Sequence, residues 1–79
     1  MSKKIYEIIS KIMGCSLTEL NDETKPEEIE NWDSFNGLIL LDQLESTFQI
    51  KFELDEVENV NSIKDIKKFL ENHGVILND

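Results

Sequence analysis

The fold is decided by residues 33–49, which read DSFNGLILLDQLESTFQ. Asp33 or Ser34 can cap a helix here, because a side-chain oxygen at that position accepts from free backbone N–H groups two or three residues on. We therefore predict a helix from Asp33 or Ser34 to about Gln49. Its apolar set is wider than a single stripe and comprises Phe35, Leu38, Ile39, Leu40, Leu41, Leu44 and Phe48. Such a helix either lies centrally among others or keeps part of its apolar surface for a partner.

A helix is also predicted upstream, at about Lys3 to Met13. Apolar residues recur there at the spacing of a helix with one apolar stripe, namely at Ile5, Ile8, Ile9, Ile12 and Met13. Gly14 follows directly, and glycine suits the left-handed conformation that closes helices. We expect the helix to end there.

Between these two helices, the segment from Cys15 to Trp32 shows no period and predicts a long loop. Connections of this length in a compact domain tend to be functional or disordered. Four large apolar residues favour a loop that is pinned to the core: Leu17, Leu20, Ile29 and Trp32. A short turn is expected at Pro26 to Ile29.

Residues 50–54 alternate between apolar and polar, a pattern that by itself could be a short strand. No second strand exists to pair with it, and an isolated strand is not stable. We therefore predict a loop that leads into a short helix at about Asp55 to Asn59. A last helix is predicted at about Ser62 to Asn72, where Ser62 and Asp65 resemble a capping box with a shorter acid.

These elements predict an all-α fold: a four-helix bundle with three main helices and one short third helix, and a long loop between the first two. His73-Gly74 should end the last helix, and the last five residues should fray. All 79 residues are expected to form a single domain, because the chain is too short for two cores.

The composition excludes several classes of function. Eight lysines and no arginine face 17 acids, which gives a formal net charge of −9 that is concentrated in residues 18–60. The phosphate backbone of a nucleic acid repels such a surface, so we expect partners with basic patches instead. No apolar run approaches the roughly 20 residues of a membrane span. We expect a cytoplasmic, soluble monomer.

The sequence gives little support for a catalytic or a metal-binding function. A serine hydrolase would need Ser34 beside a base, but the one histidine, His73, lies far along the chain, and no glycine elbow flanks the serine. We expect no catalytic residue, and we assign His73 to the dipole of the last helix. Acids between residues 27 and 33 lack the spacing and central glycine of a calcium loop, so no metal site is predicted. Cys15 is assigned no role.

Ser34 is special by position. It lies where the long loop meets the most apolar helix, and Asp33 precedes it. A hydroxyl there is exposed, fixed in position and next to backbone N–H groups that favour an attached phosphate. On residue type and position alone, a simple helix cap is the commoner role.

The segment Trp32-Asp33-Ser34-Phe35 resembles the Asp-Ser-Leu attachment motif of the acyl carrier and peptidyl carrier protein family. It lies between an acidic loop and an apolar helix, as it does in that family. The similarity extends over nearly the whole chain: Leu17 and Leu20, the stretch Leu44-Glu45-Ser46-Thr47-Phe48 followed by Ile50 and Phe52, and Ser62-Ile63-Lys64-Asp65.

The resemblance implies that Ser34 carries 4'-phosphopantetheine, which a magnesium-dependent transferase takes from coenzyme A. The arm would hold acyl or aminoacyl groups as thioesters. The protein would then be a carrier, not an enzyme, in fatty acid, polyketide, nonribosomal peptide, lipid or modified-sugar synthesis. Its implied partners are the phosphopantetheinyl transferase and the acyl- or aminoacyl-loading and transferring enzymes with basic patches.

The resemblance also implies roles for further residues. Recognition by the transferase and partner enzymes would involve Asp33, Phe35, Ile39, Asp42, Glu45, Glu56 and Glu58, with Ser46 and Glu53 near them. The bundle interior, which in relatives can sequester an acyl chain, would be lined by Leu38, Leu44, Phe52, Val57, Val60 and Ile63.

The chain departs from housekeeping fatty-acid carriers. These usually have acids shortly after the serine, where this chain has Asn36 and Ile39. They also tend to have leucine in place of Phe35 and glycine in place of Trp32. The more apolar helix favours a stand-alone carrier of a specialised pathway. The alternative, motivated by the charge of −9 and this apolar helix, is an acidic helical interaction module that is never modified.

Overall fold

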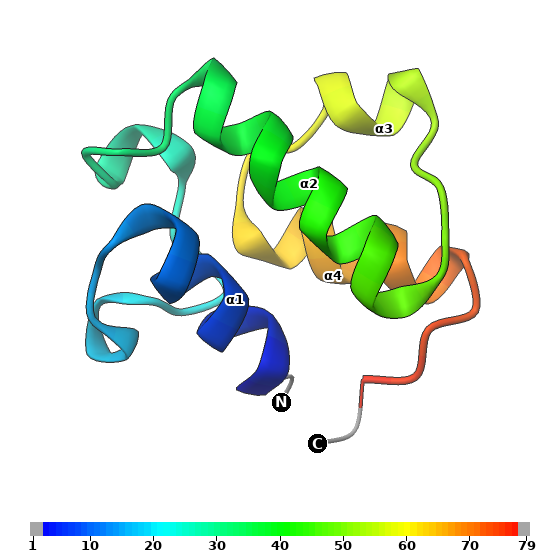
Figure 1. Cartoon of the computed structure of the whole chain (residues 1–79), viewed down its shortest axis with the longest axis horizontal. Helices are drawn as coiled ribbons and strands as arrows, with labels where there is room; N and C mark the ends of the chain where they lie inside the picture. The colour runs from blue at the N-terminus through cyan, green and yellow to red at the C-terminus, as the bar shows by residue number, and fades with distance from the viewer. Residues whose placement is uncertain (1–2, 78–79) are drawn as a thin grey trace.

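The structure is a computed structural model that describes residues 3–77, and helices are its regular elements throughout that range (Figure 1). The elements are α1 (Lys3–Met13), the 3-10 turns η1 (Leu17–Glu19) and η2 (Pro26–Glu28), α2 (Ser34–Phe48), α3 (Leu54–Glu58) and α4 (Ile63–Asn72). The predicted fold class is confirmed, and the short third helix begins one residue earlier than expected. None of the helices in this range is long and apolar enough to cross a membrane.

Helix α2 is the central element. It crosses the view of Figure 1 diagonally, with α1 on one side and α3 on the other. Leu40 and Leu44 are fully buried, whereas Phe35 is 71% exposed. The wide apolar set of α2 therefore does both things that the sequence allowed. It packs in the centre, and it leaves apolar side chains at the surface.

The core joins all three long helices to the loops between them. It consists of Ile5, Ile9, Met13, Leu20, Ile29, Leu40, Leu41, Leu44, Phe52, Ile63, Ile66 and Leu70. At helical spacing these residues form one stripe on α1 and one on α4, as the periodicity predicts. Gly14 ends α1 as expected, with a φ of +68° in the left-handed region.

The long first loop is pinned to the core at Leu20 and Ile29, and Trp32 is half-buried against it. The predicted turn after Lys25 is confirmed as η2. Leu17, however, is 45% exposed, so its predicted role as an anchor is wrong. The reason is local: a capping box between Ser16 and Glu19 shapes η1 so that its first residue faces outward.

The same loop caps α4, and the predicted capping box at the start of α4 is wrong. The Ser62 side chain makes no capping hydrogen bond. Instead, the Ile63 amide donates to the Thr24 carbonyl at 3.0 Å, and the Lys64 amide donates to the Asp22 carbonyl at 2.9 Å. Because the loop satisfies these amide groups, the serine is not needed there.

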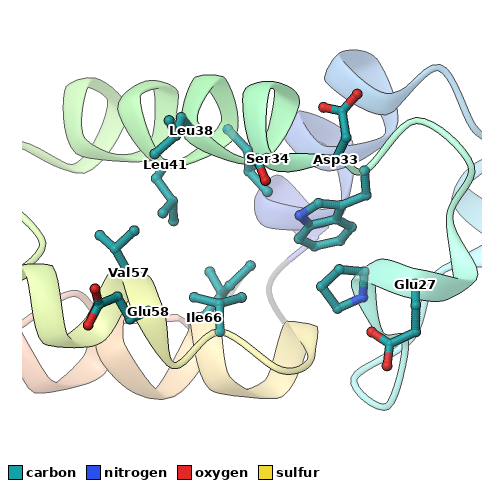
Figure 2. A pocket seen from close by; sticks show the side chains of 13 residues that line it. Glu27, Asp33, Ser34, Leu38, Leu41, Val57, Glu58 and Ile66 are labelled. Carbon is teal, nitrogen blue, oxygen red and sulfur yellow. The ribbon is translucent and has the colours of Figure 1, made fainter.

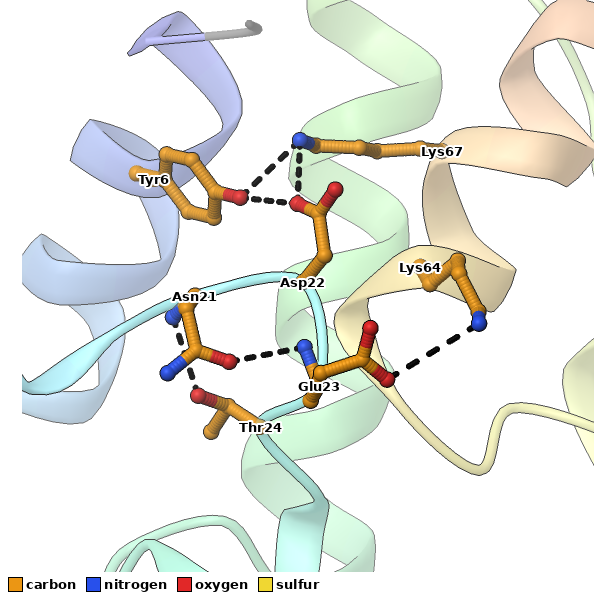
Figure 3. A network of polar contacts seen from close by, with 7 residues as sticks. All are labelled: Tyr6, Asn21, Asp22, Glu23, Thr24, Lys64 and Lys67. Carbon is orange, nitrogen blue, oxygen red and sulfur yellow. Dashed lines mark hydrogen bonds and ion pairs between the residues drawn. The ribbon is translucent and has the colours of Figure 1, made fainter.

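A polar cluster joins α1, this loop and α4 (Figure 3). The Tyr6 hydroxyl donates to Asp22 Oδ1, and Lys67 Nζ lies 2.5 Å from the same oxygen and 2.9 Å from the tyrosine oxygen. The Lys67 side chain is only 12% exposed. The lysine charge is thus neutralised by a carboxylate from a distant part of the chain. We call these three residues the Tyr6 cluster.

The C-terminal segment departs from the expected fraying. His73-Gly74 ends α4 as predicted, and the Val75 amide then donates to the Leu70 carbonyl at 3.0 Å. Val75 and Leu77 pack against the core because both are apolar side chains within reach of it. The expectation of fraying is wrong for residues 75–77, and the last two residues lie outside the described range.

Candidate functional site

The first turn of α2 is capped by Asp33. This residue is extended, and its carboxylate accepts from the Asn36 amide at 2.8 Å, while its carbonyl accepts from the Gly37 amide at 2.8 Å. The Asn36 side chain donates back to the Asn31 carbonyl at 2.7 Å. Of the two predicted candidates, Asp33 is the cap. The Ser34 hydroxyl is therefore not used as the helix cap.

Ser34 is the first residue of α2 and is exposed. Within residues 3–77 its hydroxyl has no hydrogen-bond partner, and the amides of Ser34 and Phe35 have none either. These two N–H groups lie at the positive end of a 15-residue helix dipole. A phosphate attached to the serine would therefore find amide donors and a favourable potential.

Trp32 holds the loop against this turn. Its indole Nε1 is 3.4 Å from the position that a Cβ on Gly37 would occupy. A Cβ there would just touch the ring, and a side chain larger than that of alanine would push the ring away. Sequence reasoning missed Gly37, although a glycine in the first turn of a predicted helix, five residues after a tryptophan, was a usable signal.

A cavity of about 660 Å³ opens beside Ser34 (Figure 2). Figure 2 shows Leu41 of α2 pointing toward Val57 and Ile66, with Leu38 beside it on the same helix. The cavity is lined by Pro26, Glu27, Trp32, Asp33, Ser34, Gly37, Leu38, Leu40, Leu41, Val57, Glu58, Val60 and Ile66. A long arm on Ser34 would thus start at the mouth of a space with apolar walls, and the residues present fit such a group.

The six predicted interior residues divide into two sets. Leu44, Phe52 and Ile63 are buried in the closed core and do not line the cavity. Val57, Val60 and Leu38 do line it. Leu38 is nevertheless 58% exposed, so its predicted place inside the bundle is wrong. It lies at the outer edge of the cavity, one turn after Ser34, with more than half of its surface exposed.

The predicted recognition residues also divide. Phe35, Ile39 and Asp42 are exposed on α2, and Glu58 is exposed on α3. With Leu38, the two apolar residues form an exposed strip that we call the apolar row. A role of these side chains in recognition stays a prediction.

Two predicted recognition acids are engaged within the fold instead. Glu45 is half-buried, and its carboxylate accepts from the Phe52 amide at 2.7 Å. Glu56 accepts from the Glu53 amide at 2.8 Å and from His73 Nε2 at 2.7 Å. Burial raises the pKa of the Glu56 carboxyl, but the His73 and Glu53 hydrogen bonds outweigh burial and leave this pKa lowered.

His73 was assigned from the sequence to the dipole of the last helix, and in the structure it also has a side-chain partner. It binds a carboxylate of α3 and does not line the cavity beside Ser34. The geometry gives the hydrolase hypothesis no base. Across residues 3–77, no group of three or more His, Cys, Asp or Glu side chains could hold a metal ion. Cys15 is half-buried, and burial, helped by the Glu19 charge, raises the pKa of its thiol.

A small helical fold with a free, exposed serine at the start of its central helix, beside an apolar cavity, defines a carrier protein. The family model described as a phosphopantetheine attachment site matches residues 3–70, and the chain belongs to this family. Its cofactor is covalently attached 4'-phosphopantetheine. Domains of this family interact with phosphopantetheinyl transferases and with catalytic enzymes, and are generally not catalytic themselves. A search of the curated proteins found none that matches the chain.

Proposed function

We propose that Ser34 is the attachment residue and that the chain delivers acyl or aminoacyl groups between the enzymes of a biosynthetic pathway. One observation carries this proposal: Ser34 is exposed, has no partner within the described range, and stands at the N-terminus of α2 beside the cavity. Other described serines are less suited. The hydroxyl of Ser10 donates to the Cys15 carbonyl, and that of Ser16 caps η1.

The residues around Ser34 would hold the start of the arm. The amides of Ser34 and Phe35 are positioned to donate to a phosphodiester, and the α2 dipole offsets part of its charge. When attached, the group supplies a flexible arm with a terminal thiol that carries cargo as a thioester. Asp33 is fixed by the Asn36 amide, which leaves its carboxylate exposed beside the serine for the transferase to contact.

Partner enzymes would dock on the apolar row, with Asp42 beyond it. Two exposed acids, Glu27 of the loop and Glu58 of α3, line the cavity next to Ser34. A partner with an apolar groove and flanking basic residues complements this arrangement, and the charges would mainly raise the association rate and restrict partner choice. Glu45 and Glu56 contribute less, because their carboxylates are used internally.

The apolar character of the row supports a dedicated carrier of a specialised pathway over bulk fatty-acid synthesis. Asn36 and Ile39 occupy places where housekeeping carriers usually have acids. Polyketide, nonribosomal peptide, lipid and modified-sugar assembly remain the candidate pathways. That the chain is a single domain, monomeric and cytoplasmic stays a prediction.

The test is intact mass after incubation with coenzyme A, magnesium and a broad-specificity phosphopantetheinyl transferase. The wild type should gain one arm, and Ser34→Ala should gain none while keeping its helical circular dichroism. Ser62→Ala is the matched control, because Ser62 also stands at the start of a helix and its side chain makes no capping hydrogen bond there. It should load like the wild type. Loading of Ser34→Ala would overturn the assignment of the serine.

The second candidate is an acidic interaction module that never carries the arm. It is favoured by the formal charge of −9 together with the exposed apolar row. Its distinguishing result is a basic partner that binds wild type and Ser34→Ala equally well, combined with a complete absence of modified protein in cells. A modified fraction in cells would exclude it.

A further inference from the structure

Helix α3 is less firmly anchored than α2 and α4, the other two helices that line the cavity, because both of these have buried residues. It has five residues, none of which is buried, and Leu54 at its start is 73% exposed. The flanking residues Phe52 and Ile63, by contrast, are buried in the core. The segment between these two fixed points can therefore open without unfolding the bundle, because local opening needs only the loss of the contacts that the segment itself makes.

One polar contact holds α3 to the end of α4. Glu56 Oε1 lies 2.7 Å from His73 Nε2, and the ring N–H donates to the carboxylate. The side chains are only 24% exposed for the histidine and 16% for the glutamate. The His73 ring also meets the Phe52 ring edge-on, with centroids 6.1 Å apart and planes at 88°. A contact so shielded from water is stronger than an exposed ion pair.

The same short helix is a wall of the cavity. Figure 2 shows Val57 opposite Leu41, with Glu58 beside Val57, and both α3 residues line the cavity. Glu56 is the residue before Val57, so its side chain fastens α3 immediately beside a residue that lines the cavity. Displacement of α3 would remove this wall from one side of the space next to Ser34.

We propose that the Glu56–His73 contact is a latch that holds α3 closed and so sets how readily cargo enters and leaves the cavity. The role in cargo handling rests on the proposed function of Ser34. The latch itself is a property of the unmodified fold. His73 is a positioning residue in this scheme, since it touches neither the arm nor the cargo but acts through α3.

The first experiment measures amide hydrogen exchange by NMR in the unmodified protein. The amides of Val57 and Asn59 report on α3, because they donate to the carbonyls of Glu53 and Glu56. His73→Ala should speed their exchange by about tenfold, as expected for the loss of one hydrogen bond to a charged group. Amides in the middle of α2 should change by much less.

Asn72→Ala is the matched control, because Asn72 is the adjacent, exposed last residue of α4. It should leave exchange in α3 unchanged. Glu56→Ala and the double variant complete a double-mutant cycle, in which the double variant should exchange no faster than Glu56→Ala alone. Unchanged exchange at Val57 and Asn59 in His73→Ala, or equal acceleration in α2, would overturn the latch.

The second experiment loads the proteins with octanoyl-coenzyme A and the transferase, and then measures cleavage of the thioester by hydroxylamine. If cargo is protected behind α3, cleavage in His73→Ala should increase by the same factor as exchange in α3. Equal cleavage rates, with faster exchange in α3, would overturn the role in cargo access. If Ser34 does not accept the arm, the proposed function is overturned. The latch is then tested by the hydrogen exchange of the unmodified protein alone.

Discussion

The indole of Trp32 lies against Gly37, with Nε1 3.4 Å from the place where a Cβ would stand. The contact joins the end of the long loop to the first turn of α2, three residues after Ser34. It is built from two residues five positions apart, one of them the smallest and the other the largest side chain available. The position of the attachment site relative to the loop depends on this fit.

Two substitutions at Gly37 should change the free energy of unfolding in opposite directions. Gly37→Ala places a Cβ at ordinary contact distance and removes the helix penalty of glycine, so the free energy of unfolding should rise by up to about 1 kcal/mol. Gly37→Leu must displace the indole, so it should lower the free energy of unfolding by about 1 to 3 kcal/mol. Urea unfolding followed by fluorescence of Trp32, the single tryptophan, measures both. Equal stability of the two variants would contradict this account.

The role of Asp33 as a cap can be separated from its role as a charge. Asp33→Ala removes the acceptor for the Asn36 amide and should cost about 0.5 to 2 kcal/mol of stability. Asp33→Asn keeps an acceptor oxygen, so its stability should stay close to that of the wild type. If the transferase reads the carboxylate, both variants should load more slowly. Normal loading of Asp33→Asn would show that the charge is not read.

The Tyr6 cluster should make stability depend on pH at both ends of the scale. Hydrogen bonds from Lys67 and Tyr6 lower the pKa of Asp22, so the contribution of Asp22 is present above its unfolded pKa, about 3.9, and is lost as pH falls through the lower folded value. Burial lowers the pKa of Lys67, but the hydrogen bonds to Asp22 and Tyr6 outweigh the effect of burial and leave this pKa raised. That contribution is present below about pH 10.4 and is lost as pH rises through the folded value.

Lys67→Met tests whether the charge of Lys67 stabilises the fold, because it keeps the aliphatic length and removes the charge. Its free energy of unfolding at pH 7 should fall by about 1 to 2 kcal/mol, a modest value because the Asp22 side chain is 37% exposed. The difference from wild type should shrink towards pH 2 and again above pH 11. Urea unfolding at a series of pH values gives this difference directly. A difference that stays constant with pH would assign the effect to packing.

Self-repulsion among the acids should limit stability at neutral pH. The chain carries 17 acids against 8 lysines, and most of the excess lies in residues 18–60. Raising sodium chloride to about 1 M, where the Debye length is about 3 Å, should therefore raise the melting temperature. Divalent cations should do so at lower concentration. A melting temperature that responds to neither would show that repulsion is not limiting.

Local patterns were reliable where the physics is local. The apolar spacing in residues 5–13 and the glycine after it predicted the bounds of α1, and the sequence limited the cap of α2 to Asp33 or Ser34. Two further errors depend on whether a distant segment packs against the residue. Ser62 was expected to cap α4, but the loop carbonyl of Thr24 takes the Ile63 amide instead. Leu38 was expected inside, but no described segment packs over its face of α2.

The sequence by itself determined which segments are helical and that Ser34 stands at the start of the most apolar one, because helix spacing and caps involve residues at most a few positions apart. Only the tertiary structure decided that Glu56 meets His73, that Asp22 meets Lys67, and that a cavity opens beside the serine. These contacts join residues 17 to 45 positions apart, and they form only when the helices pack. No local pattern records that packing, since it depends on the shapes of all the buried side chains together.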